Sequence, residues 1–173
     1  MIAPHDRPTV IAEVRSDRTL LWRGRRLRCA LGRSGIATAK REGDGATPAG
    51  ILPLRRLLYR ADRLPPPPGS LPREPIAVTD GWCDDAAHPD YNRQVSLPHP
   101  ARHENLSRED HLYDLVGVLG WNDDPVVSGR GSAIFLHVAR GNYPPTEGCV
   151  ALALPDLLML LAEGMISLHV RID

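Results

Sequence analysis

The sequence predicts a mainly β fold, a small sandwich or barrel-like assembly of sheets with one short helix near the C-terminus. Short apolar runs recur along the chain, and stretches rich in Gly, Pro, Asp and Asn separate them. Strong helix signals occur in one segment, 155–163. With 173 residues, 42% of them apolar, the chain can bury a core of its own, so we expect a single domain over 1–173.

The first part of the chain has the pattern of a β-meander. Strand-like runs over 9–14, 19–22 and 27–31 follow one another closely, with turn-forming residues between them. The next stretch, 32–50, is rich in Gly, Ala, Thr and charged residues, which favours a long surface loop. An apolar pattern resumes over 51–59.

Prolines dominate the segment 64–75. Four of them are consecutive, Pro65 to Pro68, and they favour an extended backbone without ladder hydrogen bonds. A domain linker and a stiff surface loop both fit this composition. We favour the loop, because the apolar runs on either side are too short for separate domains. Residues 80–100 are also expected to be a loop.

The clearest buried strands are 114–119 and 132–138, which are rich in Val, Leu, Ile or Phe and are bounded by polar residues or glycine. The helix over 155–163 has a proline and Asp156 in its first turn, and Gly164 suits the position after its end. A last strand is expected over 166–172.

Net charge and hydropathy exclude several kinds of partner. The 21 basic and 21 acidic residues cancel, so we expect no nucleic-acid partner. The most apolar stretch, 150–161, contains Pro155 and Asp156 and is shorter than the roughly 18 residues that a membrane-spanning helix needs, so no transmembrane segment is expected. No secretory signal is visible over residues 1–7. We expect a monomer without a cofactor.

The chain has three cysteines, Cys29, Cys83 and Cys149. Because this number is odd, at least one thiol lies outside any intramolecular disulfide. A disulfide between Cys29 and Cys83 remains open, and two reduced thiols are the favoured interpretation.

Cys149 and His137 are the strongest candidates for a catalytic pair. An apolar strand delivers His137, a loop rich in Gly, Asn and Pro follows, and Cys149 appears directly behind Gly148. A thiol needs a neighbouring base to become a nucleophile, and an adjacent glycine gives a reacting carbonyl access to backbone N–H groups. On spacing alone, an inert buried cysteine and a core histidine are the favoured interpretation.

Other groups of residues give weaker signals. Neighbouring acidic and histidine side chains in turns lack a recognised ligand spacing, so we predict no metal site at Asp84–Asp85, Asp110–His111 or Asp123–Asp124. Core packing is favoured over pocket lining for the aromatic residues Trp82, Tyr113 and Trp121.

The stretch from 137 to 150 resembles the catalytic motif of the L,D-transpeptidase family, the YkuD-type domain. That motif is a histidine at the end of a strand, a variable loop and then Ser/Thr-X-Gly-Cys-Ile/Val, which reads Thr-Glu-Gly-Cys-Val over 146–150 here. Leu31-Gly32 and the stretch 46–51 resemble an earlier glycine and Thr-Pro-X-Gly motif of the family. The resemblance covers roughly 10–170 and implies a β-rich catalytic domain with its cysteine at the base of a groove.

The resemblance also implies roles for individual residues. Cys149 would form a thioester and His137 would transfer protons, while the backbone N–H groups of Cys149 and Gly148 would stabilise the oxyanion. The group that orients the imidazole is left open between Glu147 and a backbone carbonyl near Val138.

Two positions depart from the pattern of many members. Glu147 stands where many have histidine, and Ala151 stands where many have an arginine that steadies a substrate carboxylate. Arg140 lies on the same loop and either replaces that arginine or is a solvated charge. Thr146, Glu147 and Arg140 are the expected substrate contacts.

The resemblance implies peptidoglycan stem peptides as partners and a role in cell-wall synthesis. A tetrapeptide donor would be cut after its third residue, a diamino acid, and joined to a second stem in a 3→3 crosslink. Hydrolysis of the same peptides, as an L,D-carboxypeptidase or endopeptidase, remains open, as do a non-catalytic peptidoglycan-binding domain and a redox-active thiol protein. The family acts in the cell envelope or periplasm, whereas the absence of a visible export signal leaves the cytoplasm open.

Overall fold

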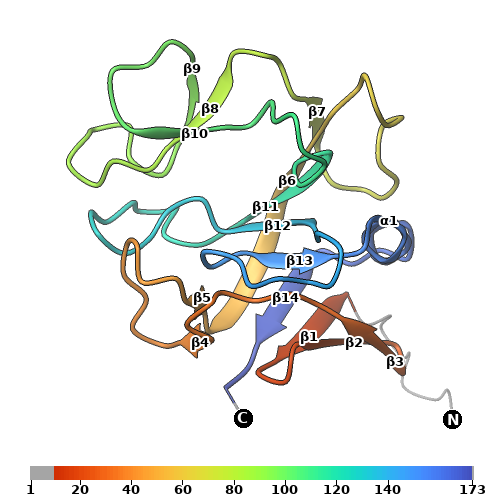
Figure 1. Ribbon diagram of the computed structural model, residues 1–173. Helices are drawn as coiled ribbons and strands as arrows, with labels where there is room; N and C mark the ends of the chain where they lie inside the picture. Colours follow the sequence, from red (N-terminus) through yellow and green to blue (C-terminus); the bar gives the residue numbers. More distant parts are fainter. Residues whose placement is uncertain (1–9, 173) are drawn as a thin grey trace, which may run out of the picture.

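The computed structural model describes residues 10–172, and it confirms the predicted mainly β fold with one helix (Figure 1). In Figure 1, β8–β10 lie above the central strands β11–β13, and β1–β3 lie below them. The elements are β1 (Ile11–Arg15), β2 (Thr19–Trp22), β3 (Arg25–Arg28), β4 (Ile36–Ala37), β5 (Thr47–Pro48), β6 (Gly50–Tyr59), β7 (Arg73–Pro75), β8 (Asp80–Cys83), β9 (Gln94–Ser96), β10 (His103–Asn105), β11 (Leu115–Leu119), β12 (Phe135–Val138), β13 (Val150–Leu152), α1 (Leu154–Ala162) and β14 (Ser167–Val170).

The main sheet is almost closed into a barrel. Its strands follow the order β13-β12-β11-β6-β14-β1-β2-β3, and β7 pairs with β6. Directly after β3, Ala30 exchanges two backbone hydrogen bonds with Ala151 of β13, at 2.8 and 3.0 Å. The two ends of the sheet therefore meet at the strand that follows Cys149.

The central strands β11 and β12 are buried along their whole length. One face, which includes Leu115 and Leu136, packs into the main core, and the other, which includes Val116 and Phe135, packs into a smaller cluster with Trp82. Strands covered on both faces have nearly continuous apolar sequences, which is why these two were the clearest in the sequence.

The helix begins and ends within one residue of its predicted bounds. Pro155 and Asp156 lie in its first turn, and Gly164 follows its end with a φ of +89°, a conformation that glycine adopts without strain. Leu157 and Leu160 are buried in the main core. The helix therefore covers one end of the barrel-like sheet (Figure 1).

Three segments predicted as loops contain strands. β8 and β9 lie within 80–100 and form a three-stranded sheet with β10, β7 lies at the end of 64–75, and β4 and β5 lie within 32–50. These strands are two to four residues long, which is too short for an alternating apolar pattern, and β5, β7 and β8 include Gly, Pro or charged residues. Their sequences therefore give no clear strand signal, and pairing with other segments makes them strands. The N-terminal strand begins at Ile11, and Thr9 lies outside the described residues.

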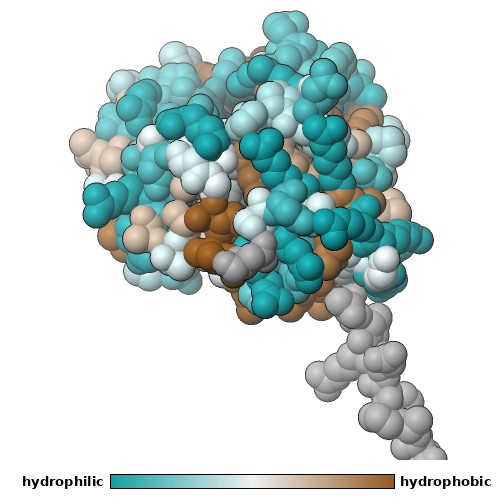
Figure 2. All heavy atoms as spheres, turned by 60° about the horizontal axis from the view of Figure 1, so that its bottom comes forward, coloured by the Kyte–Doolittle hydropathy of each residue, from teal (hydrophilic) through white to brown (hydrophobic). Residues whose placement is uncertain are grey.

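The face shown in Figure 2 is mostly hydrophilic, with a small hydrophobic patch between polar side chains. Among the described residues, no helix has the length and apolar content to cross a membrane. Residues 1–7, over which the sequence shows no secretory signal, lie outside the described part of the chain. Cys29, Cys83 and Cys149 are all free thiols and all buried.

Candidate functional site

The pairing of β12 with β13 places His137 and Cys149 on one face of the sheet. The strands are parallel, and His137 lies opposite Ala151. Cys149 precedes Ala151 by two residues, so the two side chains point to the same side. Both line one cavity of about 290 Å³, and so do the predicted contact residues Thr146, Glu147 and Arg140.

The imidazole of His137 is held by the backbone of the next residue. Its Nδ1 lies 2.9 Å from the carbonyl oxygen of Val138, which can only accept a hydrogen bond. Nδ1 therefore carries the proton, and Nε2 is left as the basic nitrogen. The ring also packs edge-to-face against Tyr113, with centroids 5.4 Å apart. Of the two candidates for the group that orients the imidazole, Glu147 and a backbone carbonyl near Val138, the carbonyl of Val138 is the one that contacts the ring.

The thiol of Cys149 is hydrogen-bonded to the chain that leads into β12. Its Sγ donates to the carbonyl of Ala133 at 3.3 Å and accepts from the N–H of Phe135 at 3.4 Å. The sequence predicts that Cys149 and His137 form a catalytic pair, whereas both hydrogen-bond partners of the thiol in the structure are backbone groups.

Burial keeps both members of the pair neutral. It raises the pKa of the Cys149 thiol to about 12, and the carboxyl of Glu104 raises it as well. Burial also lowers the pKa of His137 to about 4, although the hydrogen bond to Val138 acts in the opposite direction. The resting site thus holds a thiol and a neutral imidazole rather than a thiolate and an imidazolium.

The backbone around Cys149 is shaped by Thr146 and Gly148. The Thr146 hydroxyl accepts from the Gly148 N–H at 3.1 Å and donates to the Cys149 carbonyl at 2.7 Å. Among the described residues, none accepts a hydrogen bond from the Cys149 N–H. That N–H is therefore available to a charge that develops on a reacting carbonyl oxygen.

Gly148 is required by both its conformation and its surroundings. Its φ is +140°, and a Cβ at this position would lie 2.8 Å from the carbonyl oxygen of Ala46. The stretch that contains Ala46 is part of the second family-like motif. In the same motif, the Thr47 hydroxyl accepts a hydrogen bond from Gly32 N–H at 2.8 Å. The two motifs are therefore in direct contact.

We expect Gly148→Ala to lower the free energy of unfolding by roughly 1–3 kcal/mol, because the methyl group clashes with backbone and the φ angle is strained. Gly141→Ala is the matched control on the same loop, since nothing lies within 4 Å of a Cβ there. Urea denaturation of both variants measures the difference, and equal stability would contradict the proposed constraint.

The charged residues predicted as substrate contacts have partners on the protein. Glu147 pairs with Arg33, whose Nε lies 3.0 Å from the carboxylate, and not with His137. Arg140 is about 3.3 Å from Asp110, and 58% of its side chain is exposed. Both pairs are exposed to solvent and contribute little to stability. These side chains thus lie at the open side of the cavity.

Four further residues of the cavity come from the distant segment 104–113, and the sequence did not mark Glu104 or Arg108 among them. Glu104 lies on β10, and Arg108 lies four residues later with its guanidinium 5.2 Å from the ring centre of Tyr113. The Tyr113 hydroxyl donates to the Glu104 carboxyl at 2.8 Å. Burial raises the pKa of Glu104. No local pattern in the sequence marks Glu104 or Arg108, because pairing between β8 and β10 brings them to the site.

The aromatic residues divide between core and cavities. Tyr113 lines the cavity of Cys149, whereas Trp82 and Trp121 line a larger cavity of about 520 Å³ that contains neither Cys149 nor His137. Trp82 and Tyr113 are also buried in the smaller core, so each of them both packs in the core and lines a cavity.

The lowered pKa of His137 has a consequence for stability in acid. An unfolded imidazole protonates near its ordinary pKa of 6.5, while the folded one stays neutral until about pH 4. The unfolded state therefore binds more protons in this window, and folding stability falls as the pH falls from 6.5 towards 4. The neutral imidazole of His137 contributes on the order of 3 kcal/mol to the free energy of unfolding at neutral pH, and this contribution is lost as the pH falls to 4.

The difference in unfolding free energy between the wild-type protein and His137→Gln isolates this contribution, because other titrating groups are common to both. We expect that difference to decrease over the same pH range. A difference that stays constant from pH 7 to pH 4 would show that the imidazole titrates normally.

Comparison with known proteins agrees with these observations. The family model of the L,D-transpeptidase catalytic domain, YkuD, matches residues 6–163. No curated protein and no solved structure matches the chain significantly. The family match spans nearly the whole chain and includes both motifs that meet at Gly148. The chain therefore belongs to the YkuD family of L,D-transpeptidase catalytic domains.

Proposed function

We propose that this protein is a cysteine-dependent acyltransferase that joins peptidoglycan stem peptides in 3→3 crosslinks, and that residues 1–173 act as one catalytic domain. The observation that carries the proposal is the shared cavity of Cys149 and His137. The imidazole is fixed by Val138 with its basic nitrogen free, and the N–H of Cys149 has no acceptor among the described residues.

The first half-reaction forms a thioester. As a substrate carbonyl enters the cavity, the Cys149 thiol leaves the Ala133 carbonyl and gives its proton to Nε2 of His137. The sulfur attacks the carbonyl carbon between the third and fourth residues of the donor stem. The Cys149 N–H stabilises the oxyanion, a contribution worth about 3 kcal/mol per donor. The C–N bond then breaks, and the imidazolium protonates the departing amine of the fourth residue.

The second half-reaction transfers the acyl group. The imidazole takes a proton from the side-chain amine of the acceptor stem, the amine attacks the thioester carbonyl, and the thiolate leaves and is reprotonated. A water molecule in place of the amine gives hydrolysis, the activity of an L,D-carboxypeptidase. Arg108 and Arg140, which both line the cavity, are the groups that we assign to a substrate carboxylate in place of the arginine missing at Ala151. This substrate implies action in the cell envelope.

A non-catalytic peptidoglycan-binding domain is the second candidate. It is favoured by the resting geometry, in which the thiol is bonded to backbone and its pKa is raised. The two candidates differ in whether Cys149 becomes acylated.

Covalent trapping tests the proposal. The protein is incubated with a carbapenem, an acylating β-lactam, and its mass is measured intact and after peptide mapping. We expect one adduct, on Cys149 and not on the buried thiols of Cys29 and Cys83, which serve as internal controls. Folded protein that stays unmodified, or that is labelled at all three thiols alike, would favour the binding domain.

A further inference from the structure

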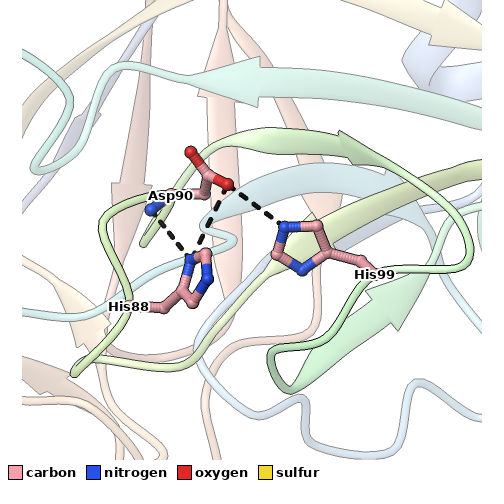
Figure 3. Close-up of side chains that lie close together, drawn as sticks. All are labelled: His88, Asp90 and His99. Atoms are coloured by element: carbon pink, nitrogen blue, oxygen red, sulfur yellow. Dashed lines mark hydrogen bonds and ion pairs between the residues drawn. The ribbon is translucent and has the colours of Figure 1, made fainter.

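Two histidines and one aspartate converge at the loops that flank β9 (Figure 3). His88 and Asp90 belong to the connection between β8 and β9, and His99 follows β9. One ligating atom from each of the three lies within 4.8 Å of the others. We propose that these residues bind a divalent transition-metal ion of the Zn²⁺ class. The site is separate from the cavity of Cys149, which none of the three residues lines.

The distances suit such an ion. Ligand atoms at 2.0–2.2 Å from a tetrahedral Zn²⁺ are about 3.3 Å apart. Oδ2 of Asp90 lies 3.1 Å from Nε2 of His99 and 3.7 Å from Nδ1 of His88. A small inward movement of His88 completes a three-residue site, and a water molecule takes the fourth position. Two imidazoles and one carboxylate are ligands that Zn²⁺ commonly uses.

The hydrogen bonds define the protons that must move. Nδ1 of His88 accepts from the Asp90 N–H at 3.1 Å, so this nitrogen already has a lone pair to offer. Nδ1 of His99 accepts from the Ala101 N–H at 3.3 Å, which places the proton of His99 on Nε2, towards Asp90. The ion takes the place of that proton, which moves to Nδ1. Metal binding therefore breaks two hydrogen bonds, from the Asp90 N–H to His88 at 3.1 Å and from the Ala101 N–H to His99 at 3.3 Å.

Neighbouring prolines restrict the two histidines, and the carboxylate of Asp90 is not engaged by an arginine among the described residues. Pro89 follows His88, and prolines flank His99 on both sides, which restricts the backbone of both histidines. The ion-pair partners of Asp90 within residues 10–172 are these two imidazoles and no arginine. Only 11% of the His99 side chain is exposed. The site is thus partly preorganised, which lowers the entropy lost when the ion binds.

The ion would stiffen a loop that reaches the thiol of Cys149. Asn92, two residues after Asp90, accepts hydrogen bonds from Trp82 Nε1 and from the Ala133 N–H, both at 3.0 Å. The carbonyl of Ala133 is the acceptor of the Cys149 thiol. A structural metal at the base of this loop therefore supports the chain that positions the nucleophile.

Zinc binding by the full chain, prepared without a histidine tag, tests the proposal. Competition with a chromogenic chelator gives stoichiometry and affinity, and we expect one equivalent of Zn²⁺ and a higher melting temperature. His99→Ala and Asp90→Asn should each weaken binding by at least about tenfold. His111→Ala is the control, because its side chain is exposed and pairs with Asp114 outside the cluster. Cys149→Ala should leave the zinc affinity unchanged.

The absorption spectrum of the Co²⁺-substituted protein gives a second readout, with ligand-field bands and no thiolate charge-transfer band. No saturable binding by the wild-type protein would overturn the proposal. So would an affinity that His99→Ala, His88→Ala and Asp90→Asn all leave unchanged, or one that Cys149→Ala removes. The side chain of Asp90 is half exposed, so Asp90→Asn should fold even if a histidine variant does not, and it still tests the site.

Discussion

We expect Cys149→Ala to lower the rate of peptide acyl transfer by about 10⁴-fold or more, because Cys149 is the one thiol among the described residues that line the cavity and it carries the proposed acyl intermediate. The remaining rate would come from substrate binding and the backbone N–H alone. The measurement is product formation from a stem tetrapeptide, with and without an acceptor peptide, followed by mass spectrometry. The ratio of crosslinked to hydrolysed product in the wild-type reaction also distinguishes the transferase from the carboxypeptidase.

Cys83→Ala is the matched control for this variant. Cys83 is a buried free thiol at the end of β8, outside the cavity, so its loss should change stability rather than the rate per folded molecule. A Cys149→Ala protein that is folded and retains wild-type turnover would remove the cysteine from the mechanism.

His137→Gln should lower the same rate by roughly 10²- to 10⁴-fold, which is the usual contribution of a general base. Glutamine fills a similar volume but cannot take the thiol proton. Substrate affinity should change little, because the loss concerns proton transfer. The measurement is kcat and KM on the tetrapeptide, together with the rate of carbapenem acylation, which should fall in parallel.

His169→Gln is the matched control, because it makes the same substitution on β14, outside the cavity. It should leave the rate of acylation unchanged. If His137→Gln kept the wild-type acylation rate, the imidazole would be a packing residue beside Tyr113. In that case the base would have to be sought elsewhere in the cavity.

Much of the site could be predicted from the sequence because its parts are local. A strand, a loop and a second strand bring His137 and Cys149 to one face, and parallel pairing is enough to bring them into one cavity. The strands β11 and β12 and the helix were equally clear, since their apolar runs and end residues are local signals. Gly148 was also visible because it directly precedes Cys149, whereas its close contact with Ala46 appears only in the structure.

The remaining parts depend on contacts that no local pattern encodes. Glu104 and Arg108 enter the cavity because β10 pairs with β8. A loop was predicted where β8 lies, and no strand was predicted over β10. The cluster of His88, Asp90 and His99 could not be predicted because His99 lies nine residues after Asp90, and only the turn of the chain around β9 brings the two side chains together. In the same way, the hydrogen bond of the thiol to Ala133 follows from backbone packing rather than from sequence spacing.

The parallel pairing of β1 with β14 has a consequence for biosynthesis. β1 is synthesised more than 150 residues before β14, so the barrel cannot close until β14 has left the ribosome. Such long-range pairing slows folding, and nascent chains expose unpaired strand edges in the meantime. The closed barrel therefore forms only once β14 is available, and protein truncated before β14 should be a substrate for chaperones and proteases rather than a folded domain.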